Sequence, residues 1–131
     1  MSDAKASILI PFKNTAAYLP ACLDSIINQS YKNWEVLIVD DSSTDQSHEI
    51  VKAYSQQDAR IRLLKNKGVG IIEALQTAYA QSTGTFITRM DSDDIMATNK
   101  IECMVADLTS KGPGYIALGL IHYLSLIHIS E

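Results

Sequence analysis

The chain has 131 residues, of which 47% are hydrophobic and 20% charged, and its formal net charge is −4. This composition fits one globular domain with a buried core and excludes a disordered chain. Because the sequence has no basic run, we do not expect it to bind nucleic acid.

The first half of the chain alternates strand-like and helix-like segments. A strand is predicted over 7–10, a helix whose apolar face holds Leu19, Leu23 and Ile26, and a strand over 35–39. Ser43 and Gln46, three residues apart, predict a capping box for a helix that runs to about Tyr54. A third strand is expected over 61–64.

The second half continues this alternation. Ile72, Leu75 and Tyr79 mark a helix that Gly84 is expected to close, and a strand follows over 85–88. Thr98 is expected to cap the next helix, and a fifth strand is expected over 115–120. The buried face of that last helix is predicted to hold Ile101, Met104, Val105 and Leu108. The pattern predicts an α/β fold with a mainly parallel sheet and helices on both faces.

Acidic residues follow two of the apolar runs. Asp40 and Asp41 come directly after the run over 34–39, and Asp91, Asp93 and Asp94 come shortly after the run over 85–88. In open α/β sheets the ligand crevice lies outside the carboxyl ends of the strands. The first strand likewise ends in polar residues, over 11–14. We therefore expect one ligand site built from three strand ends.

The second acidic segment has the composition of a metal site. Side chains alternate along an extended chain, so Asp91 and Asp93 are expected to project to one side and Ser92 and Asp94 to the other. Two convergent carboxylates with open positions suit a hard divalent cation. For this segment alone, a solvated acidic turn or carboxylates that cap the next helix are the alternatives.

Taken together, these motifs resemble the amino-terminal, nucleotide-binding half of a family 2 inverting glycosyltransferase. That family has the Rossmann-like glycosyltransferase-A fold of nucleotide-diphospho-sugar transferases. The resemblance covers roughly residues 5–110 and leads us to expect a single nucleotide-sugar-binding domain over 1–131. The matching segments, in chain order, are ILIPFKN (8–14), the helix over 18–31, EVLIVDDSSTD (35–45), NKG (66–68) and RMDSDD (89–94).

The resemblance implies a role for each matching nucleotide-site residue. It places Pro11 and Asn14 in the nucleotide pocket and makes Asp40 the acceptor of a hydrogen bond from the base. Lys67 and Gly68 are expected beside the nucleotide or diphosphate.

Asp41 is also assigned to the site, although it could instead brace its loop or cap the next helix. Asp91 is expected at the ribose or the metal, and Asp93 as a ligand of Mg²⁺ or Mn²⁺. Arg89 is expected to pair with a carboxylate, Lys13 to be exposed and Asp45 to favour the start of a helix.

The resemblance also implies partners and a reaction. The donor would be a nucleotide sugar, UDP-sugar by default, and the acceptor a saccharide or lipid-linked hydroxyl, as in polysaccharide biosynthesis. Family members usually continue for about another hundred residues that carry the acceptor site and the general base, so we expect a truncated, donor-binding half with weak or no turnover. A homodimer and peripheral membrane association of the full-length enzyme are further expectations.

Other features bear on location. Cys22 and Cys103 have no C-x-x-C spacing and are interpreted as buried free thiols of a reducing compartment. The start of the chain has no signal-peptide pattern, which indicates a cytoplasmic protein, and the resemblance extends this to the cytoplasmic face of a membrane.

The histidines and the end of the chain carry no predicted chemistry. His48, His122 and His128 show no spacing that would suit a metal site or an activated nucleophile. Residues 124–131 lack turn signals and amphipathic period, which is consistent with a reading-frame artefact.

The sequence also bears on three other classes of protein. A binding module that holds a nucleotide without turnover is the main alternative. A sugar-1-phosphate nucleotidyltransferase would need a glycine-rich, basic loop after the first strand, but residues 11–15 contain no glycine. A phospho-receiver domain would place paired carboxylates after the first strand, where this chain has none.

Overall fold

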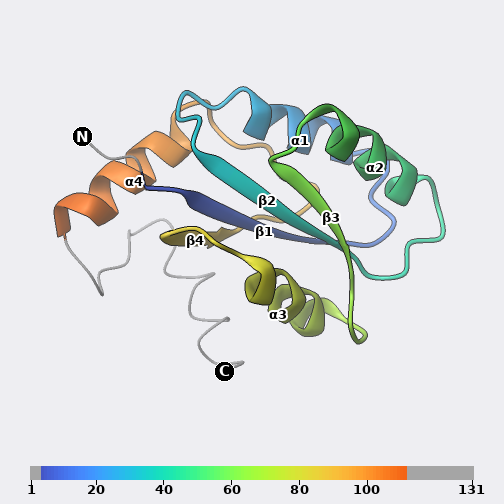
Figure 1. Ribbon diagram of the computed structural model, residues 1–131. Helices are drawn as coiled ribbons and strands as arrows, with labels where there is room; N and C mark the ends of the chain where they lie inside the picture. The colour runs from blue at the N-terminus through green and yellow to red at the C-terminus, as the bar shows by residue number, and fades with distance from the viewer. Residues whose placement is uncertain (1–3, 112–131) are drawn as a thin grey trace.

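The structure, a computed structural model, describes residues 4–111. Within that range, strands and helices alternate along the chain (Figure 1). Their bounds are β1 Ala6–Phe12, α1 Leu19–Ile27, β2 Trp34–Asp40, α2 Ser47–Gln57, β3 Ile61–Lys65, α3 Ile71–Gln81, β4 Phe86–Arg89 and α4 Lys100–Lys111. The fifth strand predicted over 115–120 and the tail over 124–131 lie outside the described residues.

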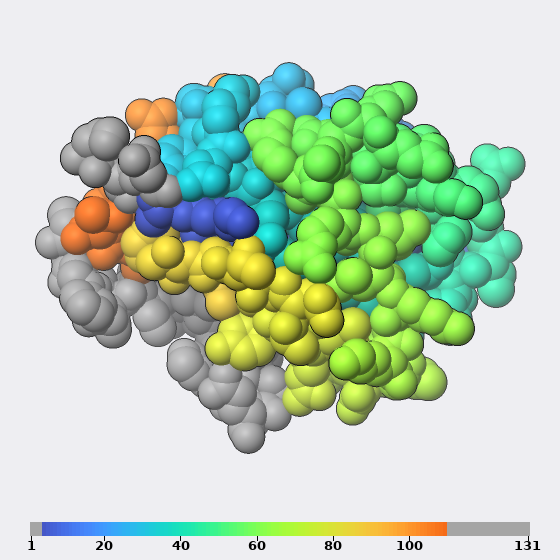
Figure 2. Space-filling view, in the orientation of Figure 1, coloured from blue at the N-terminus to red at the C-terminus, as the bar shows by residue number. Residues whose placement is uncertain are grey.

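The strands form one parallel sheet in the order β3-β2-β1-β4. Ile8 of β1 pairs with Val36 on one side and with Thr88 on the other. Every residue of β1 is buried, and in Figure 2 this strand (blue) shows only as a narrow strip between cyan and yellow segments. The order reverses beside β1, because the chain moves outward to β2 and β3 and then returns to place β4 on the other side.

Helices cover both faces of the sheet, as predicted. Alternate side chains of β1 and β2 point to opposite faces, so Ile8 and Ile10 join one core cluster while Leu9 and Leu37 join another. The first cluster lies under α1, α2 and α4, and the second lies under α3 (Figure 1). This parallel, doubly covered sheet is the Rossmann-like architecture expected from the sequence.

The packing of α1 and α4 follows their apolar spacing. In α1, Leu19, Cys22, Leu23 and Ile26 are all fully buried, and a proline stands in the first turn. In α4 the predicted face is confirmed, because Ile101, Met104, Val105 and Leu108 are all buried. The free thiol of Cys103 is exposed, so its predicted burial is wrong.

The predicted start signals of α2 and α4 are wrong. Helix α2 begins at Ser47 without a side-chain cap, and Asp45 Oδ1 accepts the Ser47 N–H at 2.9 Å. The hydroxyl of Ser43 instead accepts the N–H of Asn14 at 3.1 Å. Helix α4 begins at Lys100, so the residue directly before it is Asn99 and not Thr98. The Ser43 hydroxyl, which the sequence assigned to a helix cap, takes part in a tertiary contact with Asn14.

The buried face of α3 also differs from the prediction. Leu75 is buried, but Ile72 and Tyr79 are 42% and 41% exposed. The helix packs on the sheet mainly through small residues, with Ala74 and Ala78 buried beside Leu75. Small side chains let the helix approach the sheet closely, which turns the larger apolar residues outward.

Gly84 does not terminate α3, which ends at Gln81 with Ser82 at the C-cap. A Cβ atom at Gly84 would lie 2.4 Å from Ser7 Oγ and 2.8 Å from the carbonyl oxygen of Lys5. The glycine therefore permits a close approach between the start of β4 and β1.

This approach belongs to a buried polar network near the amino ends of the strands. Glu35, 5% exposed, accepts hydrogen bonds from the Ser7 hydroxyl at 2.7 Å and from the Thr83 N–H at 2.6 Å. Ser7 in turn accepts the Gly84 N–H at 2.8 Å. Burial acts to raise the pKa of Glu35, but hydrogen bonds from Thr83 and Ser7 and the charge of Lys5 outweigh it, so this pKa lies below its usual value.

No helix within residues 4–111 is long and apolar enough to cross a membrane.

Candidate functional site

A cleft of about 410 Å³ opens at the carboxyl ends of β1, β2 and β4. It lies beside the point where the strand order reverses, which is where open α/β sheets bind ligands. Four residues predicted for the site border this cleft: Pro11, Asp41, Asp91 and Asp93. The other lining residues are Phe12, Lys13, Thr15, Ile71, Arg89 and Ser92.

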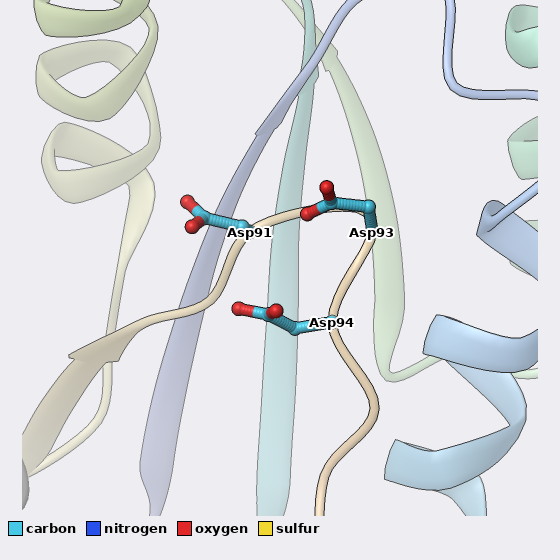
Figure 3. A group of neighbouring side chains, drawn as sticks. All are labelled: Asp91, Asp93 and Asp94. Atoms are coloured by element: carbon cyan, nitrogen blue, oxygen red, sulfur yellow. The ribbon is translucent and has the colours of Figure 1, made fainter.

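Three carboxylates converge in the loop that follows β4. Asp91, Asp93 and Asp94 each offer one oxygen, and these oxygens lie within 4.8 Å of one another. Figure 3 shows the side chains of Asp93 and Asp94 extending toward the side on which Asp91 lies. The predicted alternation is wrong because the chain turns here: the N–H of Asp94 donates to the carbonyl of Asp91 at 3.0 Å. That turn brings Asp94 into the group that the sequence limited to two residues.

The donor set fits a hard divalent cation. Mg²⁺ and Mn²⁺ prefer oxygen ligands, and bonds of about 2.1 Å span ligand oxygens up to about 4.2 Å apart. Oxygens within 4.8 Å of one another need only small side-chain rotations to reach that geometry. Asp91 is partly buried while Asp93 and Asp94 are exposed, so positions for water or phosphate oxygens remain open.

Arg89 pairs with the first of these carboxylates, as predicted. Its Nη2 lies 3.0 Å from Asp91 Oδ1, and its side chain is only 10% exposed. A mostly buried guanidinium fixes the direction of its partner because its donors have a rigid geometry. Asp91 therefore reaches the cleft with one oxygen already engaged.

The thiol of Cys22 lies beneath the acidic loop. Its Sγ is 3.8 Å from the carbonyl oxygen of Asp91, within range of a weak hydrogen bond. Burial, and then the negative charges of Asp94, Asp93 and Asp91, raise the pKa of Cys22 to about 12. The thiol is thus neutral at physiological pH and can donate to the loop.

Asp40 is held by its own loop. Its Oδ1 accepts the N–H of Ser43 at 2.9 Å, and its Oδ2 lies 2.9 Å from Nδ1 of His48. No sequence pattern indicated this contact, because the two residues are eight apart and meet only through the turn into α2. Asp40 does not border the cleft, so its contact with a base remains a prediction.

Asp41 braces a neighbouring loop. Its Oδ1 accepts the Gly70 N–H and a side-chain N–H of Asn66, each at 3.0 Å. Of the interpretations left open by the sequence, bracing is the one the structure supports, although the braced loop follows β3. Asp41 still borders the cleft and joins the ends of β2 and β3 there.

Asn14 makes a similar brace from β1. Its backbone φ is +55°, a left-handed conformation that asparagine tolerates better than most residues. Its Oδ1 accepts the N–H groups of Thr44 at 2.7 Å and Asp45 at 3.2 Å. Asn14 therefore shapes the loop after β2 and does not itself border the cleft.

Lys67 and Gly68 lie apart from the cleft in the loop between β3 and α3. Both are exposed, and the Gly68 N–H donates to Asn66 Oδ1 at 3.1 Å. Their predicted contact with a nucleotide remains a prediction. Lys13 is exposed, as expected, yet it borders the cleft and is a cation available to a phosphate.

Two lining residues lie outside every segment that the sequence predicted for the site. Thr15 borders the cleft just after the predicted site segment, and Ile71 reaches it from the first turn of α3. Only the position of α3 over the sheet brings Ile71 to the cleft, so no local sequence pattern indicated it.

Comparison with known protein families gives a direct assignment. The model of the family described as "Glycosyl transferase family 2" matches residues 7–125. The chain belongs to glycosyl transferase family 2.

Curated relatives agree with this assignment. The chain is 41% identical over 107 residues to Glycosyltransferase GlyG of Streptococcus pneumoniae serotype 4, a match that covers 80% of the chain and 35% of GlyG. It is 38% identical over 107 residues to the UDP-Glc:alpha-D-GlcNAc-diphosphoundecaprenol beta-1,3-glucosyltransferase WfgD of Escherichia coli, covering 81% of the chain and 42% of WfgD. The matched part of this family 2 chain therefore spans less than half the length of each of these relatives.

Solved structures share its fold. TarS 1-349 of S. aureus in complex with UDP-GlcNAc superposes with a TM-score of 0.75 at 27% identity, over 81% of this chain and 31% of that one. The mannosyltransferase PcManGT of Pyrobaculum calidifontis in complex with GDP-Man and Mn²⁺ gives a TM-score of 0.66 at 26% identity, over 72% of this chain and 29% of that one. The parallel sheet described above is thus the fold of these glycosyltransferases.

Proposed function

We propose that this family 2 chain forms the donor-binding part of a metal-dependent glycosyltransferase. The enzyme transfers a sugar from a nucleoside diphosphate sugar to an acceptor hydroxyl with inversion at the anomeric carbon. The observation that carries the proposal is the group of three convergent carboxylates beside a cleft of about 410 Å³.

Charge supports the need for a cation. Asp91, Asp93 and Asp94 lie close together in a chain whose net charge is −4, and they would repel a diphosphate. A divalent ion held by these carboxylates supplies Lewis-acid stabilisation of the leaving nucleoside diphosphate. Arg89 keeps Asp91 directed toward the site, and Lys13 offers a further positive charge at the cleft.

The donor is proposed to be a UDP-sugar first and a GDP-sugar second. WfgD is named for UDP-Glc, TarS is in complex with UDP-GlcNAc, and PcManGT is in complex with GDP-Man and Mn²⁺. These names support a nucleotide-sugar donor and Mn²⁺ or Mg²⁺ as the ion, and they leave the choice of base and sugar to experiment.

The second candidate is a module that binds the donor without turnover. General base catalysis needs a free group within reach of the attacking hydroxyl. Among the described carboxylates that border the cleft, Asp41 braces a loop, Asp91 pairs with Arg89, and Asp93 is assigned to the metal. This arrangement favours donor binding by these 131 residues, with sugar transfer by a longer chain.

The acceptor and the cellular setting complete the proposal. We propose a saccharide or lipid-linked acceptor used in polysaccharide biosynthesis at the cytoplasmic face of a membrane, which the diphosphoundecaprenol substrate in the name of WfgD supports. A homodimer is proposed on the strength of the sheet edge at β4, which pairs only with β1 among the described strands.

Calorimetric titration of UDP, with and without Mn²⁺, tests the donor site. We expect Mn²⁺-dependent binding that weakens at least about tenfold in Asp93→Asn and in Asp94→Asn. Glu49→Gln, on the first turn of α2, removes the same charge elsewhere and should bind as the unmodified chain does.

Each failure has its own meaning. If neither UDP nor GDP binds in the presence of metal, the donor-site proposal is wrong. If Asp94→Asn alone binds normally, the ion needs only Asp91 and Asp93. If UDP binds but no sugar is transferred to any acceptor, the 131 residues act as the binding module.

A further inference from the structure

The segment that carries the acidic residues has no regular structure of its own. Between the end of β4 at Arg89 and the start of α4 at Lys100, the chain forms only turns and irregular backbone. Backbone N–H and C=O groups in such a segment need partners from elsewhere in the fold. Helix α1 and the residues just after it supply most of the long-range partners found there.

Ser25 of α1 makes the first of these contacts. Its hydroxyl donates to the Cys22 carbonyl at 2.7 Å within the helix and accepts the N–H of Met96 at 2.9 Å. Met96 is 8% exposed and packs in the core cluster together with Met90. The two methionines therefore anchor the acidic residues from both sides, and Ser25 fixes the backbone at the second anchor.

Gln29 makes the second set of contacts with this segment. It is fully buried, and its amide N–H₂ donates to the carbonyls of Ala97 at 2.5 Å and Ser25 at 3.1 Å. Its Oε1 accepts the N–H of Ile101 at 3.0 Å. The amide thus uses both donors and its acceptor, and it ties the end of the irregular segment to the first turn of α4.

Cys22 and Ser30 complete the set of contacts. Cys22 Sγ lies 3.8 Å from the Asp91 carbonyl, and the Ser30 N–H donates to the Thr98 carbonyl at 2.9 Å. Cys22 and Ser25 lie three residues apart on one face of α1, and Gln29 and Ser30 follow the end of that helix. These residues contact the acidic segment from its first carboxylate to the start of α4.

We propose that Ser25 and Gln29 are positioning residues for the metal site, because they fix the backbone that makes the three carboxylates converge. Asp93 and Asp94 are exposed, so packing of their own side chains does not hold this backbone. The inference rests on the proposed metal role of the acidic group. It adds Ser25 of α1 and Gln29, which follows that helix; neither belongs to the acidic group or lines the cleft, and both act through hydrogen bonds to the loop.

The test uses the 131-residue chain with Ser25→Ala, which leaves the Met96 N–H without its acceptor. Ser25→Thr keeps the hydroxyl and serves as the rescue. Ser55→Ala is the matched control, because Ser55 makes the same bond to a carbonyl three residues earlier, at 2.7 Å, on α2. Mn²⁺ affinity is measured by electron paramagnetic resonance, and hydrogen exchange of the Asp94 amide by NMR, at a temperature where every variant is folded.

We expect Ser25→Ala to bind Mn²⁺ about tenfold more weakly and to exchange the Asp94 amide faster, while Ser25→Thr and Ser55→Ala match the unmodified chain. The Asp94 amide bonds to Asp91 and not to Ser25, so its exchange reports the turn itself. If Ser25→Ala does not fold, Gln29→Glu, which keeps the shape and the acceptor but loses the amide donors to Ala97 and Ser25, is expected to give the same result.

Equal Mn²⁺ affinity and equal exchange in Ser25→Ala and Ser55→Ala would overturn the inference. If the unmodified chain does not bind Mn²⁺, the proposed metal role fails, and the Asp94 amide alone decides the positioning role. Faster exchange in Ser25→Ala but not in Ser55→Ala then supports the positioning role, and equal exchange in the two variants refutes it.

Discussion

Replacing Gly84 with alanine should cost more stability than an exposed glycine substitution normally does. The new Cβ would lie 2.4 Å from Ser7 Oγ, 2.8 Å from the Lys5 carbonyl oxygen and 2.9 Å from the Ser7 nitrogen. Two of these three atoms belong to the backbone, so relief requires movement of the start of β1 or of the chain before β4. Overpacking of this kind costs about 1–3 kcal/mol.

The same movement would disturb the buried hydrogen bonds at this end of the sheet. The Gly84 N–H donates to Ser7 Oγ at 2.8 Å, and Ser7 Oγ donates to buried Glu35 at 2.7 Å. Losing one such bond costs about 1 kcal/mol, which brings the expected loss of unfolding free energy to about 2–4 kcal/mol. For a domain of this size the melting temperature should fall by about 7 °C or more.

Urea denaturation followed by circular dichroism measures this loss, and Gly68→Ala is the control. A Cβ at Gly68 would meet only the flexible side chain of Glu73, 2.8 Å away at Oε1, so its stability should change by less than about 0.5 kcal/mol. If the two variants unfold at the same urea concentration, the close approach at Gly84 is not what makes glycine necessary there.

Two further predictions concern carboxylates that accept several hydrogen bonds. Because the pKa of Glu35 is lowered in the folded chain, its contribution to stability is complete above its unfolded pKa of about 4.3 and is lost as the pH falls through its folded pKa. Urea titrations from pH 7 to pH 3 should show this loss of unfolding free energy, and the loss should be smaller in Glu35→Gln. If the unfolding free energy falls equally with pH in the unmodified chain and in Glu35→Gln, this role of Glu35 is contradicted. Asp41→Ala leaves the Gly70 N–H and one side-chain N–H of Asn66 without their acceptor, so it should cost about 1–3 kcal/mol and speed hydrogen exchange of the Gly70 amide, measured by NMR. Unchanged exchange would show that Asp41 does not hold this loop.

The sheet and its core were predictable because they depend on patterns of short range. The apolar run before Asp40 and the spacing of Leu19, Leu23 and Ile26 each indicate one element, and parallel pairing follows from their alternation. The polar contacts of Ser43 and Gly84 were not predictable in this way. Each meets a partner 29 or more residues away, so a rule based on local sequence predicted helix-end roles that these residues do not have.

The acidic loop shows why pattern reasoning was incomplete at the site. Side chains alternate between two sides only where the chain is extended, and the chain is not extended in the turn from Asp91 to Asp94. Sequence reasoning therefore found two of the three carboxylates. The contact between Asp40 and His48 escaped it for a related reason, because the loop after β2 folds back before α2 begins.

The predicted site carboxylates fall into two groups once their hydrogen bonds are counted. Asp40 accepts bonds from Ser43 and His48, and Asp41 accepts bonds from the loop after β3, so both stabilise the walls of the site. Asp93 and Asp94 are exposed and converge with Asp91 at the end of β4. An ion gains most from carboxylate oxygens that the fold has not already used, and Arg89 engages only one oxygen of Asp91, so the second group is the one proposed to bind the cation. Under that proposal, the first group acts on the donor mainly by fixing the loops that shape the cleft.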